Sequence, residues 1–311
     1  MEEHAQPPDP ARLRDLAERG VYIGTSSWKY PGWIGTIYSG ERYEYRGRFS
    51  EARFNRDCLE EYATRFSTVC VDAGYYRFPT EDYLQKLAAQ VPNHFRFGFK
   101  VTDEITIKNF PNLTRFGNRA GQGNTRFLDG NLFTDAFLGP MESIREKVGV
   151  LMLEFSRFHT CDFEAGRQFV DAMDAFFEQV PKGWPLAVEI RNRNFLQTPY
   201  FEMLRRHGVA HVWNNWTQMP PVSEQMAIPE SRTCDLLAAR FLLTPGRLYK
   251  QAVEAFQPYS KTQAPDENAR SAGRDIVKEI LAKTRALTGF IFVNNRLEGH
   301  SPSTIDAMLN V

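Results

Sequence analysis

Short runs of apolar residues recur along the whole chain, each bounded by polar or turn-forming residues. Most are rich in Val, Ile, Leu and Phe, and several alternate between apolar and polar positions as half-buried strands do. We therefore predict a strand in each run. The predicted strands are Val21–Thr25, Thr68–Asp72, Phe95–Val101, Val148–Phe155, Leu186–Arg191, Val209–Asn214, Leu236–Leu242 and Gly289–Asn294.

Stretches with apolar residues at three- and four-residue spacing lie between these runs and predict helices. They are Asp57–Phe66, Glu81–Gln90, Phe163–Val180, Tyr200–His207 and Asp275–Leu287. Alternating strands and helices indicate βαβ units and a parallel sheet. Eight strands favour a closed (β/α)8 barrel of the TIM type. An open doubly wound sheet is the alternative, but no G-x-G-x-x-G or P-loop motif supports it.

The N-terminal segment differs from the rest of the chain. Met1–Pro10 is acidic and proline-rich without an apolar core, unlike a signal peptide, and Ala11–Gly20 predicts a short helix below the first strand. We expect an N-terminal extension over residues 1–20 and one barrel domain over residues 21–311. Because no stretch approaches the roughly 20 apolar residues of a spanning helix, we expect no membrane partner. The widely spaced cysteines form no dense disulfide framework, so we expect a cytoplasmic protein.

Three connections are long and rich in Gly, Asn, Arg and aromatic residues: Gly40–Arg56, Thr102–Gly130 and Thr244–Gly273. Each follows a predicted strand, so a barrel would place all three on its C-terminal face, where barrel active sites lie. Loops of this length are usually functional or disordered. The glycine-rich run Gly117–Asn124 is either a lid or a disordered segment.

Charged residues fall on the face of several strands that should point into the barrel. In Leu186–Arg191 the apolar residues alternate with Glu189 and Arg191, and in Phe95–Val101 the phenylalanines alternate with Lys100. By the same alternation Asp72 and Arg240 point inward. Most of these residues stand near the C-terminal ends of their strands, so we expect them to meet at the barrel mouth.

The inward set contains more cations than carboxylates, which suits an anionic ligand, because guanidinium groups bind carboxylate and phosphate in bidentate fashion. Arg191 and Arg240 would hold the anion, and Lys100 would act as an electrophilic stabiliser or acid. Glu189 would act as base or hydrogen-bond acceptor, and Asp72 could share acid and base roles with it. The strand around Glu154 is apolar throughout, so the direction of that side chain is ambiguous.

Other interpretations of these charges stay open. They could form a purely structural salt-bridge network, or Asp72 and Glu189 could hold a divalent cation. Lys100 could form a Schiff base if desolvation lowered its pKa. The six histidines show no metal-binding spacing, so we expect no metal or other cofactor.

Aromatic and amide side chains follow other strands. Trp28 and Tyr30 follow the first strand and Tyr76 follows the second, where they could stack on a sugar or base or pack a loop. Asn294 and Asn295 end the eighth strand, and we expect one of them to fix a loop and the other to contact a ligand. These five residues are the remaining candidates for substrate binding.

Composition narrows the partners further. The chain has 38 basic and 38 acidic residues, so no global field attracts nucleic acid or an anionic membrane, and such a partner would need a local basic patch. The four cysteines, which are widely spaced, are expected to be buried thiols. They are Cys58, Cys70, Cys161 and Cys234.

Several of these segments together resemble the YecE-like family, also called domain of unknown function 72. The resemblance implies a TIM-type barrel and assigns no activity. Lys100, Glu189, Arg191, Arg240 and the Asn pair match the family's pattern. The matching segments are G-T-S-S-W-K-Y-P-G-W (Gly24–Trp33), Y-Y-R-F-P (Tyr75–Pro79), F-R-F-G-F-K (Phe95–Lys100), A-V-E-I-R (Ala187–Arg191) and V-N-N-R-L-E-G-H-S-P (Val293–Pro302).

The chain departs from the family's usual residues at other positions. Cys70 and Asp72 replace a usual glutamate and asparagine, Thr106-Ile107 replaces Thr-His, and E-F-S-R-F (Glu154–Phe158) replaces a glutamine-proline stretch. Arg240-Phe241-Leu242 replaces Arg-x-His on the seventh strand. Because a histidine is lost at two places, chemistry that depends on histidine is not expected here.

Two functions follow from these residues. The first is an enzyme acting on a small anionic or polyhydroxylated substrate, such as a phosphorylated sugar or a nucleoside, at the barrel mouth. The second is nucleic-acid binding or processing, because the loops Gly40–Arg56 and Arg115–Arg126 interleave arginines with aromatics. A non-catalytic small-molecule sensor on a barrel scaffold is a third possibility, because the fold alone does not decide function.

Overall fold

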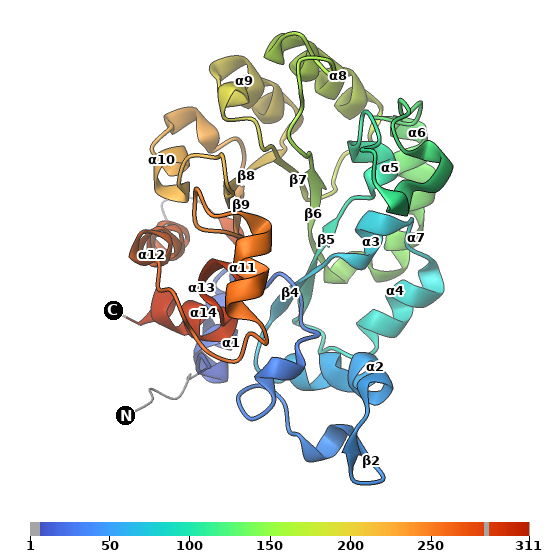
Figure 1. Cartoon of the computed structure of the whole chain (residues 1–311). Helices are drawn as coiled ribbons and strands as arrows, with labels where there is room; N and C mark the ends of the chain where they lie inside the picture. The colour runs from blue at the N-terminus through green and yellow to red at the C-terminus, as the bar shows by residue number, and fades with distance from the viewer. Residues whose placement is uncertain (1–6, 283–285, 311) are drawn as a thin grey trace.

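The computed structural model describes residues 7–282 and 286–310. Its central feature is a closed barrel of eight parallel strands in the order β1-β10-β9-β8-β7-β6-β5-β4, surrounded by helices (Figure 1). The predicted (β/α)8 barrel is therefore confirmed, and the open doubly wound sheet is wrong. The barrel strands are β1 (Val21–Thr25), β4 (Thr68–Val71), β5 (Arg96–Lys100), β6 (Val148–Glu154), β7 (Leu186–Glu189), β8 (Ala210–Asn215), β9 (Leu236–Phe241) and β10 (Thr288–Val293).

The larger helices pack outside this barrel, and shorter helical turns join them to the strands (Figure 1). The α-helices are α1 (Pro10–Glu18), α2 (Glu51–Tyr62), α3 (Ala73–Tyr76), α4 (Glu81–Ala88), α5 (Asp103–Thr106), α6 (Gly130–Leu132), α7 (Gly139–Met141), α8 (Gly166–Gln179), α9 (Thr198–His207), α10 (Val222–Met226), α11 (Tyr249–Phe256), α12 (Glu267–Leu281), α13 (Asn295–Glu298) and α14 (Ser301–Leu309). The turns are η1 (Pro31–Trp33), η2 (Glu41–Tyr43), η3 (Thr114–Arg119), η4 (Phe133–Leu138), η5 (Glu142–Lys147), η6 (Arg193–Phe195) and η7 (Pro229–Ser231).

Two helices begin earlier than their apolar periodicity predicts. Helix α2 begins at Glu51 because Ser50 caps it, its hydroxyl accepting a hydrogen bond from the backbone N–H of Arg53. Helix α12 begins at Glu267 because the carboxylate of Asp266 accepts from the N–H of Ala269. The predicted starts at positions 57 and 275 were therefore wrong. The last residues predicted for the second of these helices include 283–285, which lie outside the described residues.

The interior of the barrel is apolar below its mouth. Cys70, Val150 and Phe292 are among the buried residues that fill it, whereas Phe97 and Val69 face the surrounding helices, as the alternation predicts. The filling is tight: a Cβ at Gly98 would lie only 2.4 Å from the ring of Phe292. Glycine at this position thus lets a phenylalanine from the opposite side occupy the interior.

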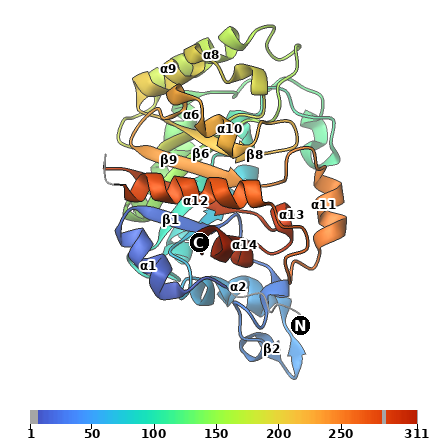
Figure 2. The ribbon, with the colours of Figure 1, turned by 90° about the vertical axis from the view of Figure 1, so that its left-hand side faces the viewer.

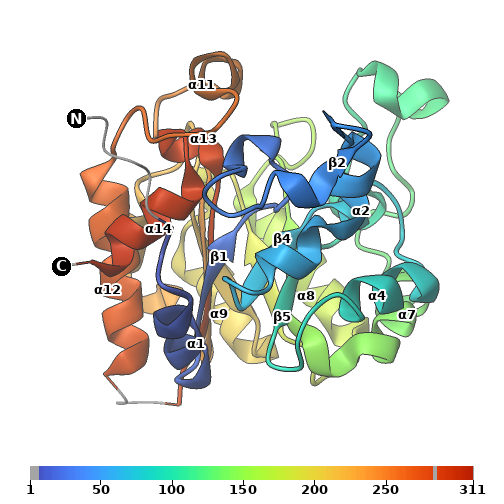
Figure 3. The same ribbon diagram turned by 90° about the horizontal axis from the view of Figure 1, so that it is seen from below.

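The two ends of the barrel are built differently. Helix α1 lies at the N-terminal end with Leu13 and Leu16 buried, while α11 and the hairpin of β2 (Glu44–Tyr45) and β3 (Arg48–Phe49) project at the other end (Figures 2 and 3). The predicted N-terminal helix is thus confirmed, although residues 1–6 of the expected extension lie outside the described residues. No described helix is long and apolar enough to cross a bilayer.

The long connections after β1, β5 and β9 contain local structure. The run Gly117–Asn124 is anchored, because the side-chain amide of Asn124 donates to the carbonyls of Glu104 and Ile107 at 2.8 and 2.7 Å. The structure therefore shows this run as an anchored loop rather than as a disordered segment. Cys58 and Cys70 are buried as predicted, but Cys161 is exposed and Cys234 only half-buried, so the prediction was wrong for those two.

Candidate functional site

Six charged side chains meet at the C-terminal mouth of the barrel, and we call them the mouth network. Four come from strands, at the ends of β5, β6 and β7 and within β9; one follows directly after β4 and one stands two residues after β7. Strand pairing sets the level of these residues along the barrel axis. Glu154 on β6 pairs with Glu189 on β7, and Asn214 on β8 pairs with Arg240 on β9. The network consists of Asp72, Lys100, Glu154, Glu189, Arg191 and Arg240.

Arg240 joins the two glutamates from across the barrel. Its Nη1 donates to Oε2 of Glu154 and, at 2.5 Å, to Oε2 of Glu189. All three residues are at most 5% exposed, so the attraction acts with little screening by water. Arg240 therefore neutralises two neighbouring carboxylates that would otherwise repel each other.

Glu154 stands at the centre of the mouth network, and the sequence did not show this. Besides its contact with Arg240, it forms ion pairs with Nζ of Lys100 at 3.1 Å and with Nη2 of Arg191 at 2.9 Å. Strand β6 is buried along its whole length, so its alternation carries no information about direction. A usable signal was nonetheless present: Glu154 is a charge at the end of an apolar strand, the same place that Glu189 occupies on the next strand.

Glu154 and Lys100 of the mouth network stay ionised although they are buried. Burial alone would raise the pKa of Glu154, but Arg191, Lys100 and Arg240 hold it well below its ordinary value. Burial would likewise lower the pKa of Lys100, yet the carboxylates of Glu154 and Asp72 raise it. This raised pKa argues against the Schiff-base hypothesis for Lys100, which requires a lowered pKa and a neutral amine.

The predicted excess of positive charge is also wrong. Lys100, Arg191 and Arg240 face three carboxylates rather than two, because Glu154 joins Asp72 and Glu189. The mouth network is thus balanced, with three cations against three anions. A balanced set offers both donors and acceptors to a ligand but no net attraction for an anion.

One edge of the mouth network reaches solvent. The side chain of Asp72 is 43% exposed and lies 3.7 Å from Nζ of Lys100, whose own side chain is only 10% exposed. The ring of Tyr75 lies 4.0 Å from that Nζ, and Trp216 stacks 3.8 Å from the guanidinium of Arg191. Asp72 is thus the most exposed group of this edge, with Lys100 and Tyr75 largely covered and Glu189 0% exposed.

The same arrangement bears on the alternative of a divalent cation between Asp72 and Glu189. Protein cations already occupy the neighbourhood of both carboxylates, with Lys100 beside Asp72 and two arginines on Glu189. Within residues 7–282 and 286–310, no three His, Cys, Asp or Glu side chains are grouped as metal ligands. The donor set of the mouth therefore does not fit a metal ion.

The predicted aromatic and amide residues mostly bond to and pack against groups outside the mouth network. Trp28 is buried, with its carbonyl accepting from the hydroxyl of Tyr38, and Tyr30 packs edge-on against Tyr259. Asn294 accepts from the N–H of Arg296. Asn295 accepts from both the N–H and the hydroxyl of Ser301, so both asparagines fix loops.

Tyr76 belongs to a different feature, an exposed rim around the mouth. It is 62% exposed, with the guanidinium of Arg115 at 5.7 Å from its ring. Every large hydrophobic side chain that the structure describes as exposed lies on a segment following β1, β4, β5 or β9, all at this end of the barrel. They are Ile34, Tyr45, Phe49, Tyr76, Leu113, Leu248 and Tyr249.

Fold and site together define a TIM-type barrel whose mouth holds a balanced ionic network. The chain belongs to the family described as protein of unknown function DUF72, whose model matches residues 22–311. It is similar to a DUF72 family protein from Enterococcus faecalis, with 17% identity, a TM-score of 0.58 and 93% of each chain covered. A DUF72 family protein from Thermotoga maritima matches with 18% identity, a TM-score of 0.54, and 93% of this chain and 96% of that chain covered. No curated protein matches the chain.

Proposed function

We propose that the barrel mouth binds and transforms a small, uncharged, polyhydroxylated molecule, of the sugar or nucleoside class. The observation that carries this proposal is the charge balance of the mouth network, which presents carboxylate acceptors next to ammonium and guanidinium donors. A hydroxyl group both donates and accepts, so it can bridge such neighbours. A phosphorylated substrate, in contrast, would need the cation excess that Glu154 removes.

The position of each group suggests its role in such an enzyme. Asp72 is the network carboxylate that solvent reaches most, so it accepts a proton or hydrogen bond from a substrate hydroxyl. Lys100, which stays protonated, stabilises the negative charge that develops on the reacting oxygen. Glu189 and Arg240 lie deeper and act as positioning residues that hold Glu154 and Arg191 in place.

A binding panel tests the substrate class. Isothermal titration with neutral monosaccharides, nucleosides and their phosphate esters is expected to give saturable binding for neutral compounds. Asp72→Asn should weaken it roughly tenfold, since one charged hydrogen bond is lost. Asp82→Asn is the matched control, because Asp82 also pairs with a lysine, on the exposed face of α4. Binding of phosphate esters alone, no saturable binding, or equal effects of both variants would contradict the proposal.

The exposed rim supports a second candidate, binding of single-stranded nucleic acid. Tyr45 and Tyr76 are exposed with arginines near their rings, and Arg296 lies 4.6 Å from the ring of Tyr249. Aromatic rings stack on bases while arginines hold phosphates. Such sites can act locally even when the whole chain is neutral.

Fluorescence anisotropy with a labelled single-stranded oligonucleotide at increasing salt tests this candidate. Affinity should fall steeply with salt, and Arg115→Gln should reduce the slope by roughly one charge. Arg167→Gln on α8 is the control, because that arginine is exposed and pairs with Asp171 rather than lying against an exposed aromatic ring. A flat salt response, or the same change for both variants, would exclude this candidate.

A further inference from the structure

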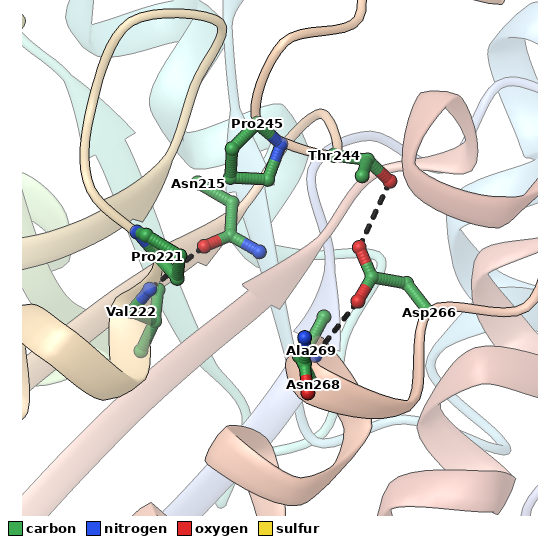
Figure 4. A pocket seen from close by; sticks show the side chains of 8 residues that line it. All are labelled: Asn215, Pro221, Val222, Thr244, Pro245, Asp266, Asn268 and Ala269. Carbon is green, nitrogen blue, oxygen red and sulfur yellow. Dashed lines mark hydrogen bonds between the residues drawn. The ribbon is translucent and has the colours of Figure 1, made fainter.

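A pocket lies in the helical layer, outside the barrel wall. It is bounded by the end of β8, the segment after β9 and the first residues of α10 and α12 (Figure 4). Asn214 on β8 lies on the inward face with the barrel lining, and its side-chain amide donates to the carbonyl of Ile190. The next residue, Asn215, therefore points outward, so this pocket is separate from the mouth network.

Asn215 supplies an unused donor to this pocket. Its residue is only 2% exposed, and its Oδ1 accepts from the backbone N–H of Val222 at 2.9 Å. Its Nδ2 has no hydrogen-bond partner among the described residues and points into the open space in Figure 4. Because this donor faces the open space of the pocket, a ligand acceptor at this position would gain a hydrogen bond from it.

Asp266 faces Asn215 from the opposite side of the pocket. Its Oδ2 accepts from the hydroxyl of Thr244 at 2.9 Å, and its Oδ1 accepts from the N–H of Ala269 at 3.0 Å (Figure 4). Its own N–H donates to Oε1 of Glu298 at 2.6 Å, which fixes the backbone. An ionised carboxylate has about four lone-pair sites, so Asp266 can still accept from a ligand donor.

The remaining walls carry no positive charge and are apolar except at Thr244 and Asn268. Pro221, Val222, Pro245 and Ala269 line them, and the cavity has a volume of about 180 Å³. This is well above the roughly 10–15 Å³ that one water molecule needs. With one carboxylate and no lining cation, the pocket disfavours anions and suits a neutral molecule of several heavy atoms.

From this geometry we infer that the pocket is a binding site for a small neutral molecule with a secondary amide or lactam group. The amide carbonyl accepts from Nδ2 of Asn215, and the amide N–H donates to the carboxylate of Asp266. The proline rings and Val222 cover the apolar part of the molecule. Donor and acceptor on opposite walls thus match the two poles of an amide, which a carboxylate, an acceptor only, does not reproduce.

The wild-type protein allows a direct test with N-methylacetamide as the probe. Nuclear magnetic resonance titration should shift the side-chain NH2 signal of Asn215 and the backbone amides of residues 267–269 saturably, with Kd on the order of 1 mM or weaker. N,N-dimethylacetamide, which keeps the carbonyl but lacks the N–H, should bind several-fold more weakly. No saturable shift at Asn215, or equal binding of both probes, would overturn the inference.

A variant pair isolates the contribution of Nδ2. Asn215→Asp keeps the oxygen that accepts from Val222 but replaces the donor with a second acceptor, so it should weaken binding roughly tenfold. Asn294→Asp is the matched control, because Asn294 also caps a helix through its Oδ1, at the start of α13. Unchanged binding in Asn215→Asp, checked to be folded by circular dichroism, would contradict the inference, as would an equal loss in Asn294→Asp.

Discussion

Two buried glutamate–arginine arrangements in this barrel differ in how completely their groups are partnered. At the mouth, Glu154 and Glu189 share one nitrogen of Arg240. In the helical layer, Glu298 accepts two parallel hydrogen bonds of 2.9 Å from Nε and Nη2 of Arg270. Glu298 is 0% exposed, like Glu189, so burial alone does not separate the two arrangements.

The difference lies in the remaining hydrogen-bonding capacity. The carboxylate of Glu298 also accepts from the hydroxyl of Thr304 and the N–H of Asp266, and thereby ties α12, α13 and α14 together. At the mouth, Nε of Arg240 is buried without a partner among the described residues. Structural networks tend to satisfy every buried polar group, whereas an unsatisfied one calls for an explanation. We therefore call the Glu298 arrangement a structural clip, whereas the mouth network keeps one unsatisfied donor, which the proposed function would explain.

The largest expected effect comes from removing Arg240, the more deeply buried of the two arginines that pair with both mouth glutamates. Arg240→Met leaves Glu154 and Glu189 buried side by side, and should lower the free energy of unfolding by about 3–5 kcal/mol. Urea unfolding followed by circular dichroism measures this change. Arg240→Lys keeps one positive charge and should lose less. If Arg240→Met were as stable as the wild type, the ionic coupling of the mouth would be refuted.

The next expected effect is on the pH dependence of the free energy of unfolding, which should differ between the two regions. Burial lowers the pKa of His300, next to the structural clip, from 6.5 to about 4. As pH falls, the unfolded chain therefore takes up a proton at His300 before the folded chain does. The free energy of unfolding should decrease by about 3 kcal/mol for this histidine as pH falls from 6.5 to 4. The pKa of Glu154 is held well below its ordinary 4.5, so the stability it contributes is lost only below about pH 4.5.

A variant at position 300 checks this assignment. His300→Asn keeps an acceptor near Nδ1 for the N–H of Ser303, but it cannot titrate. Unfolding free energies measured between pH 7 and pH 4 should depend less on pH in this variant than in the wild type. An unchanged slope would show that His300 is not the group that titrates in this window.

A smaller effect is expected from weakening the structural clip itself. Glu298→Gln keeps the shape of the side chain but removes its charge, so Arg270 turns to Glu267, which it already contacts at 2.8 Å. The free energy of unfolding should fall by about 2 kcal/mol, the usual value for a charged hydrogen bond. Urea unfolding again measures it. A loss larger than that of Arg240→Met would reverse the comparison between the two regions.

The fold could be predicted because its signals are local. Each barrel strand appears as an apolar run, and the outward phenylalanines of β5 alternate with Gly98 and Lys100 as a pleated strand requires. The helix starts at Glu51 and Glu267 were missed although Ser50 and Asp266, both common capping residues, precede them. Here the capping signal lay within segments that were interpreted as loops.

The site could be predicted only in part. Charges at the ends of alternating strands, such as Lys100 and Glu189, were expected to meet, and the structure brings them together around Glu154. Glu154 itself gave no directional signal, because both faces of β6 are buried. The pocket between Asn215 and Asp266 could not be foreseen, since it depends on three segments far apart in sequence that meet only in the folded chain.

The smallest effect on stability is expected at the exposed edge of the mouth, and there the comparison becomes sharpest. Asp72→Asn removes a carboxylate that is 43% exposed and lies 3.7 Å from Nζ of Lys100, so the free energy of unfolding should change by less than about 1 kcal/mol. Yet this is the carboxylate that the proposed function assigns to the substrate. Stability near that of the wild type, together with loss of binding to neutral sugars or nucleosides, would mark the mouth network as a site rather than a clip. If Asp72→Asn instead destabilised the fold as strongly as Glu298→Gln, the outer edge would be as structural as the clip, and the distinction between the two arrangements would fail.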